Sequence, residues 1–206
     1  MSDLTESGEK MSEEKRPAVG EPEESGEKQM DVKKEILSWV FYIAFVVVAS
    51  WLIITFVGQR TRVDGRSMMN TLSDGDNLIV DKLSYRFGDP KRFDVIVFSP
   101  YGTKEYYIKR IIGLPGETVQ IDADGNIYIN GELLEEDYGA ETIRSAGRAA
   151  EPVTLGEDEY FVMGDNRNNS KDSRSEEVGN VKRSQFVGRA WLRIWPLNQI
   201  GFLRHQ

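Results

Sequence analysis

Hydrophobic and polar residues are distributed unevenly along the chain, and one stretch near the N-terminus is apolar throughout. Residues 36–57 have the sequence I-L-S-W-V-F-Y-I-A-F-V-V-V-A-S-W-L-I-I-T-F-V, without a charged side chain. A helix of this length spans the roughly 30 Å hydrocarbon core of a bilayer. Trp39, Tyr42 and Trp51 lie towards its ends, where aromatic rings favour the membrane interface. Because helices of soluble domains seldom stay apolar on every side, the pattern predicts a transmembrane helix rather than a buried core helix.

The segment before this stretch is polar and acidic. Residues 1–35 contain eleven acidic and six basic side chains and very few aliphatic ones. Such a composition does not bury enough apolar surface to offset the entropy lost on folding, so we expect a disordered tail. The short basic region that opens a cleaved secretory signal is missing. Lys33 and Lys34 before the span, against Arg60 and Arg62 after it, give a small bias towards a cytoplasmic tail and an extracytoplasmic domain.

After the span, apolar residues come in short β-branched and aromatic runs that end in turn residues, a pattern typical of β-strands. Asp124-Gly125 and Asn130-Gly131 are strong hairpin signals. The close spacing leaves no room for crossover helices, so residues 58–206 are expected to form one mostly antiparallel β domain. The predicted strands are residues 95–98, 106–112, 118–121, 127–129 and 160–163, with a long polar loop at 134–152.

Composition narrows the possible chemistry. The net charge of −8, much of it in the tail, argues against a nucleic-acid-binding protein, which needs a basic surface. The absence of cysteine excludes disulfides, thiol proteases and thiolate metal sites. The single histidine, His205, argues against a zinc site or a Ser-His-Asp triad. We therefore expect neither a metal ion nor a cofactor.

A candidate nucleophile lies shortly after the apolar stretch, where residues 65–72 have the sequence G-R-S-M-M-N-T-L. Taken alone, Ser67 is more often a turn serine or a helix N-cap than a catalytic group. The G-x-S-x-G pattern of a nucleophile elbow is absent. With almost no histidine in the chain, Ser67 needs another base.

Lys109 is the candidate base, in the strand-like run Y-Y-I-K-R-I-I. Lysines on strands are usually exposed. Here the aromatic and aliphatic neighbours would desolvate the ammonium group and lower its pKa. A neutral lysine can take the serine proton and return it to a leaving amine. Arg110, the next residue, would point to the opposite face of the strand and need its own carboxylate.

The third notable segment is residues 164–174, G-D-N-R-N-N-S-K-D-S-R. A solvated loop is one interpretation, and a calcium loop is another, because Asp165 and Glu176 have the first-to-last spacing of such a loop. The calcium interpretation fails, since Arg167 stands where a ligand is needed and Ser170 replaces the turn glycine.

A buried supporting network explains this segment better. Asp172 and Arg174 are close enough in sequence to form an ion pair, and Asp165 is a candidate partner for Arg110.

Together the three segments resemble those of bacterial type I signal peptidases, which are membrane-anchored Ser/Lys proteases. The family's boxes G-x-S-M-x-P-T, K-R-x-I-G-L-P-G and G-D-N-R-x-N-S-x-D-S-R are similar to G-R-S-M-M-N-T, K-R-I-I-G-L-P-G and the third segment here. The runs F-D-V-I-V-F, I-Y-I-N-G-E and R-I-W-P-L-N also resemble the family. The resemblance extends from the anchor to the C-terminus, and it implies a signal-peptidase or LexA-like antiparallel β fold preceded by one transmembrane helix.

The resemblance implies a role for several residues. Ser67 would be the nucleophile and its backbone N–H an oxyanion donor, Lys109 the general base, and Ser170 a hydrogen-bond partner that orients Lys109. Asn70 replaces the usual proline, and Gly65 stands where some members have a serine that helps bind the oxyanion. The structural ion pairs implied are Asp172 with Arg174 and Asp165 with Arg110.

The implied substrate is an exported preprotein whose signal peptide lies extended beside residues 62–65 and 106–108 and places small residues, in an A-x-A-like pattern, in shallow pockets. The implied location is the plasma membrane, with membrane lipid around the anchor and no nucleic acid or metal as partner. The candidate substrate-binding residues are Val63, Asp64, Gly65, Met68, Tyr107 and Ile108.

Two other functions compete with this one. Self-processing Ser/Lys proteases that cleave repressors look similar around the dyad but are soluble, so the apolar span argues against them. A non-catalytic, membrane-tethered β module predicts that no acylating inhibitor reacts with Ser67.

Overall fold

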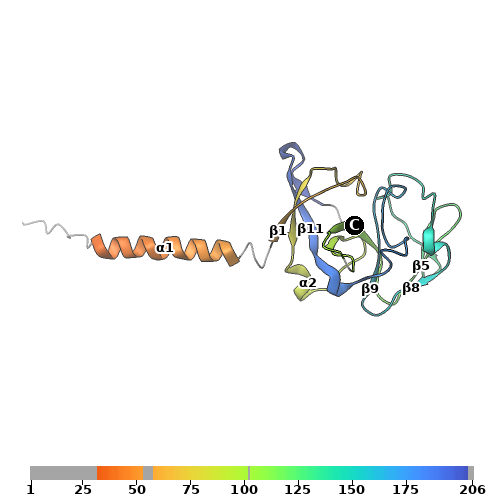
Figure 1. Ribbon diagram of the computed structural model, residues 1–206, viewed down its shortest axis with the longest axis horizontal. Coiled ribbons are helices and arrows are strands. Elements are labelled where there is room, and N and C mark those ends of the chain that lie inside the picture. The colour runs from red at the N-terminus through yellow and green to blue at the C-terminus, as the bar shows by residue number, and fades with distance from the viewer. Residues whose placement is uncertain (1–31, 53–57, 102, 204–206) are drawn as a thin grey trace, which may run out of the picture. The chain divides into compact units, whose positions relative to one another are not determined.

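The computed structural model describes residues 32–52, 58–101 and 103–203 (Figure 1). Helix α1 is Val32–Leu52, and none of its side chains is buried. It is long and apolar enough to cross a membrane. It begins four residues before the predicted start because Lys33, Lys34 and Glu35 are good helix formers. The predicted tail and the predicted end of the span lie outside the described residues.

The remainder of the described chain forms two antiparallel sheets. The larger has the order β1-β2-β11-β3-β4-β9-β10, with β12 paired to β11, and the smaller has the order β7-β6-β5-β8. Figure 1 shows β5 and β8 at the end of the domain away from β1. The strands of the larger sheet are β1 (Gly58–Arg62), β2 (Asn77–Asp81), β3 (Val95–Phe98), β4 (Tyr107–Gly113), β9 (Glu159–Met163), β10 (Val181–Lys182), β11 (Phe186–Trp195) and β12 (Gly201–Phe202). Those of the smaller sheet are β5 (Thr118–Ile121), β6 (Ile127–Ile129), β7 (Glu132–Leu133) and β8 (Val153–Thr154).

Helical segments in the domain are short. They are α2 (Ser84–Phe87), η2 (Gly147–Ala150), η3 (Arg183–Gln185) and η4 (Leu197–Gln199). The predicted loop at residues 134–152 has no strand, but it contains η2 and buries Tyr138, Ile143 and Ala149. This segment is therefore packed against the domain.

The predicted strands agree with the structure to within one residue at each end. The predicted hairpin turns also form: Gly125 and Gly131 both have φ of 85°, in the left-handed region that glycine adopts readily. The prediction missed β1, β2, β11 and the two-residue strands β7, β8, β10 and β12. Of these, β11 is a ten-residue strand in the interior of the larger sheet. The mostly antiparallel β fold is confirmed.

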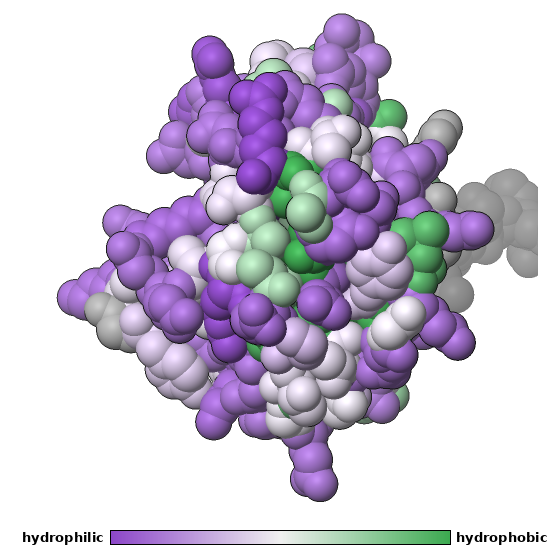
Figure 2. Space-filling model, turned by 90° about the vertical axis from the view of Figure 1, so that its right-hand side faces the viewer, coloured by the Kyte–Doolittle hydropathy of each residue, from purple (hydrophilic) through white to green (hydrophobic). Residues whose placement is uncertain are grey.

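Strand β4 is buried on both faces, and this positions the candidate site. Ile112 packs in the cluster that includes the smaller sheet, Ile108 in the cluster under β2 and β11, and Ile111 in a third cluster. Because successive side chains of a strand point to opposite faces, Lys109 and Arg110 are both buried but face different neighbours. Figure 2, which views the domain from the side of the smaller sheet, shows a largely hydrophilic face with hydrophobic side chains gathered in a narrow hollow.

Close backbone packing between β2 and β11 gives a prediction for stability. A Cβ atom at Gly188 would overlap the carbonyl oxygen of Asp81 on β2. We expect Gly188→Ala to lower the free energy of unfolding by about 1–3 kcal/mol, as overpacking does. The matched control is Gly201→Ala, because a Cβ at Gly201 meets no atom within 4 Å. Chemical denaturation of both variants provides the measurement, and equal stability of the two would contradict the close packing.

Candidate active site

Ser67 lies in the connection between β1 and β2, and its loop is held from both sides. Gly65 has φ of 95° and donates its N–H to Asp74 Oδ1 at 3.0 Å. After the serine, Met68 and Leu72 are both 99% buried and are linked by a helical turn in which Leu72 N–H donates to Met68 O at 2.8 Å. The nucleophile candidate therefore stands at the start of an anchored turn.

Asn70 has φ of 92°, a left-handed conformation that asparagine tolerates better than most residues. Proline has its φ fixed near −65°. The backbone conformation of the turn after Ser67 therefore differs from one with proline at position 70, the residue that the G-x-S-M-x-P-T box has there.

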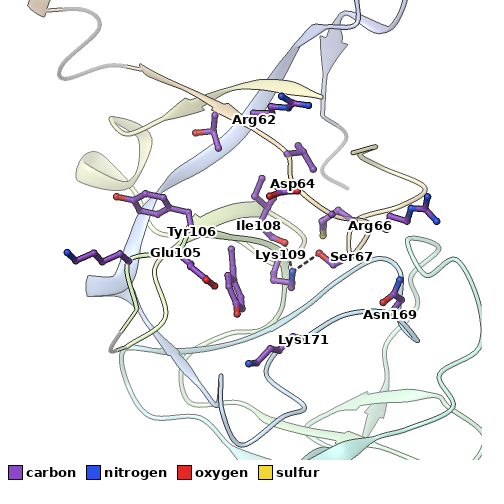
Figure 3. Close-up of a pocket in the computed structure, with 16 residues that line it drawn as sticks. Arg62, Asp64, Arg66, Ser67, Glu105, Tyr106, Ile108, Lys109, Asn169 and Lys171 are labelled. Carbon is purple, nitrogen blue, oxygen red and sulfur yellow. Dashed lines mark hydrogen bonds between the residues drawn. The ribbon is translucent and has the colours of Figure 1, made fainter. Parts of the chain in front are cut away.

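Lys109 reaches Ser67 from β4 (Figure 3). Its Nζ lies 2.7 Å from Ser67 Oγ and donates to Ile108 O at 2.9 Å. The distance between lysine and serine is within the range of about 2.6–3.2 Å that proton transfer requires. Burial lowers the pKa of Lys109 to about 8, although the carboxylates of Asp172 and Asp165 act in the opposite direction.

Arg110 and Asp165 form a fully buried, two-pronged ion pair on the other face of β4. Arg110 Nε lies 2.9 Å from Asp165 Oδ1, and Arg110 Nη2 lies 2.8 Å from Asp165 Oδ2. Thr71 Oγ1 donates to the same carboxylate at 2.5 Å, and Arg110 Nη1 donates to Phe93 O at 2.8 Å. The guanidinium group lies 3.6 Å from the ring centre of Tyr138. This cluster ties β4, the serine loop and the third segment together.

Asp172 and Arg174 form the second expected ion pair. Arg174 Nε lies 2.9 Å from Asp172 Oδ1, and Arg174 Nη2 lies 2.8 Å from Asp172 Oδ2. The same carboxylate accepts the N–H of Gly164 at 3.0 Å, and Arg174 donates to Arg167 O at 2.5 Å. These bonds close residues 164–174 into a compact loop beside the dyad.

Ser170 does not make the hydrogen bond to Lys109 that the family resemblance implies. Its buried Oγ has no hydrogen-bond partner among the described residues. The expected hydrogen bond to Lys109 is therefore absent, and the partners of Nζ are Ser67 Oγ and Ile108 O. Ser170 is packed against Gly164, where a Cβ would overlap both the Ser170 hydroxyl and the carbonyl oxygen of Ser67.

Asn166 is a residue of the site that sequence reasoning missed. Its backbone N–H donates to Ser67 O at 3.0 Å, and its side-chain amide donates to Arg66 O at 3.1 Å. The carbonyl of Arg66 and the N–H of Ser67 belong to one planar peptide unit, so holding the first fixes the direction of the second. The sequence marked residues 164–174 as a notable segment. It gave no sign that Asn166 contacts the loop of Ser67, about 100 positions earlier in the chain.

An open groove of about 660 Å³ runs past the dyad (Figure 3). Its walls are residues 61–68 on one side and residues 104–109 on the other, with Asn169 and Lys171 completing it. No group of three His, Cys, Asp or Glu side chains in the described part of the chain is placed to hold a metal ion. All the candidate substrate-binding residues line the groove: Val63, Asp64, Gly65, Met68, Tyr107 and Ile108.

An antiparallel β domain with a serine and a buried lysine in contact beside an extended groove is the arrangement of a serine hydrolase that uses lysine in place of histidine. Comparison with known proteins specifies the class. Residues 36–195 match the family model described as signal peptidase, peptidase S26. The chain belongs to this family.

Individual relatives agree with the family match. The chain is 43% identical to a probable signal peptidase I-2 of Synechocystis sp., over 72% of this chain and 68% of the relative. It is 39% identical to a signal peptidase I of Leptolyngbya laminosa, over 88% of this chain and 91% of the relative. A solved structure, a signal peptidase I from Enterococcus faecalis V583, is 37% identical and covers 50% of this chain and 97% of its own, with a TM-score of 0.41.

The buried ion pair gives a second prediction. Asp165→Ala leaves the Arg110 guanidinium charged and without its carboxylate in the core, and removing one partner of a buried pair typically costs about 3–5 kcal/mol. The control is Asp89→Ala, because Asp89 pairs with Arg183 but is 94% exposed, where ion pairs contribute little. Thermal unfolding should show a large loss only for the first variant. Equal melting temperatures would mean that the Arg110 pair does not stabilise the domain.

Proposed function

We propose that this chain removes signal peptides from exported preproteins, with Ser67 as the nucleophile and Lys109 as the general base. The observation that carries the proposal is the 2.7 Å contact between the two side chains, in a chain that belongs to the signal peptidase family. The relatives named signal peptidase I match over most of this chain, which favours a signal peptidase over a non-catalytic module.

Burial makes Lys109 suitable as a base. The side chain is only 4% exposed, and with a pKa of about 8 roughly a tenth of the lysines are neutral at pH 7. A solvent-exposed lysine, with a pKa near 10.4, would be neutral in fewer than about one molecule in a thousand. Desolvation therefore increases the population of competent enzyme by more than two orders of magnitude.

The reaction follows from the geometry. Ser67 Oγ attacks the scissile carbonyl carbon while its proton passes to Lys109 Nζ. The resulting ammonium group gives that proton to the leaving amine, the C–N bond breaks, and an acyl-enzyme remains. Neutral Lys109 then takes a proton from water, the hydroxide attacks the ester, and the proton returns to Ser67 as the signal peptide leaves.

The oxyanion needs donors where negative charge develops. The backbone N–H of Ser67 is the first donor, and Asn166 holds its peptide unit through Arg66 O. Gly65 has no hydroxyl, so its side chain supplies no second donor.

The groove suits an extended peptide. Residues 62–65 and 106–108 supply strand-like edges whose main-chain groups can pair with a substrate backbone. Val63, Met68 and Ile108 are buried apolar residues of its lining, and we expect them to contact small side chains of the substrate. An A-x-A-like segment fits this lining, because alternate residues of an extended chain point to the same side.

The proposed location is the plasma membrane, with α1 as a single-pass anchor surrounded by lipid, the N-terminus in the cytoplasm and the catalytic domain outside. The length and apolar character of α1 support the anchor. The substrate supports the orientation, since exported preproteins are cut on the side to which they are delivered. The chemistry assigned to Ser67 and Lys109 uses no metal ion.

Substitution of the dyad tests the catalytic roles. We expect Ser67→Ala and Lys109→Ala to lower kcat for a preprotein substrate by at least about a thousandfold, because the nucleophile or its base is lost. Ser73→Ala and Lys91→Ala are the matched controls, since both residues are exposed and lie outside the dyad and the groove. An acylating serine inhibitor should label Ser67 in the unsubstituted chain. Normal processing by either dyad variant would remove that residue from the mechanism.

The pH profile tests the protonation state of the base. Because the neutral form of Lys109 is active and its pKa lies near 8, kcat/KM should rise about tenfold per pH unit below 8 and level off above about 9. The measurement uses a substrate with no group that titrates between pH 6 and 9. A flat profile from pH 5 to 9 would exclude a titrating lysine base.

A further inference from the structure

Arg66 occupies the position next to Ser67, and the residue is exposed. Among the described residues it has no carboxylate partner. The side chain nevertheless lines the groove. In the family's box this position is left open to any residue, so the arginine is not required for the shared chemistry.

The two ends of the groove differ in charge. In Figure 3, Arg62, Glu105 and Tyr106 lie at one end, and Arg66 and Asn169 lie at the other, with the dyad between them. The first end mixes both signs, because Glu105 accompanies Arg62, and Asp64 lies between that end and the dyad. At the second end Arg66 is the charged residue among the groove-lining residues labelled in Figure 3, beside the neutral Asn169.

The proposed function assigns a direction to the substrate. The signal peptide lies between residues 62–65 and 106–108, so the chain that follows the scissile bond leaves past Ser67 towards Arg66. The first residues of the mature protein are therefore the part of the substrate that meets an unpaired positive charge. Lys171, which also lines the groove, has its ammonium group paired with Glu177 and contributes less net charge.

We propose that Arg66 is a specificity-determining residue that favours preproteins with an acidic side chain among the first three residues of the mature segment. This inference rests on the proposed function. An arginine offers a carboxylate two parallel hydrogen bonds as well as charge. Because the pair forms at an exposed site, the preference is modest and sensitive to salt.

The test uses the full chain in detergent and a series of signal-peptide substrates that carry Glu, Ala or Lys at the first, second or third mature position. The readout is the ratio of kcat/KM for the Glu substrate to that for the Lys substrate. We expect a ratio of about three to five at low salt for at least one position, falling towards one at 1 M salt. Arg66→Ala should bring the ratio close to one, Arg66→Glu should invert it, and Arg66→Lys should retain most of it.

Arg62→Ala is the matched control, since it removes the same charge from the opposite end of the groove, and its ratio should match that of the unsubstituted chain. A ratio of one in the unsubstituted chain, an unchanged ratio in Arg66→Ala, or an equal loss in Arg62→Ala would overturn the inference. These failures leave cleavage itself intact. Absence of cleavage for every substrate would instead overturn the proposed function.

Discussion

The candidate site depends on keeping one ammonium group partly out of water without surrounding it with free negative charge. Burial lowers the pKa of Lys109, whereas Asp172 and Asp165 raise it. Each of these carboxylates is held by its own guanidinium group, Asp172 by Arg174 and Asp165 by Arg110. The arginines therefore have an electrostatic effect besides their structural one: they neutralise carboxylates that would otherwise hold Lys109 in its protonated form.

Strand β4 carries Lys109 and Arg110 as consecutive residues and places them in different surroundings. The alternation of a strand sends Lys109 towards the serine and Arg110 towards the core. Both are buried, because hydrophobic clusters pack against the faces of β4.

Much of this was predictable from the sequence, and the exceptions have physical causes. Short apolar runs and glycine turns predicted five strands, and the composition around Ser67 and Lys109 predicted that a serine would need a lysine. Strand β1 was missed because its sequence, G-Q-R-T-R, has no apolar residue. It is a strand because its backbone pairs with β2.

Strand β11 was missed for another reason. Its pairing with β2 and β3 contains register shifts, which break the two-residue alternation that a sequence pattern detects. The absent bond to Ser170 and the contact of Asn166 with the serine loop depend on tertiary geometry, which local patterns do not encode.

The third segment is what converts two separate features of the sequence into one site. Asp165 holds Arg110 on β4, and the next residue, Asn166, holds the peptide units on both sides of Ser67. Gly164, just before them, lets the two loops approach more closely than any side chain would permit. One stretch of three residues thus sets the position of β4, which carries Lys109, and the orientation of the peptide units around Ser67. Since the contact between Asn166 and Arg66 joins positions 100 residues apart, the geometry around Ser67 and Lys109 depends on tertiary contacts and not on either loop alone.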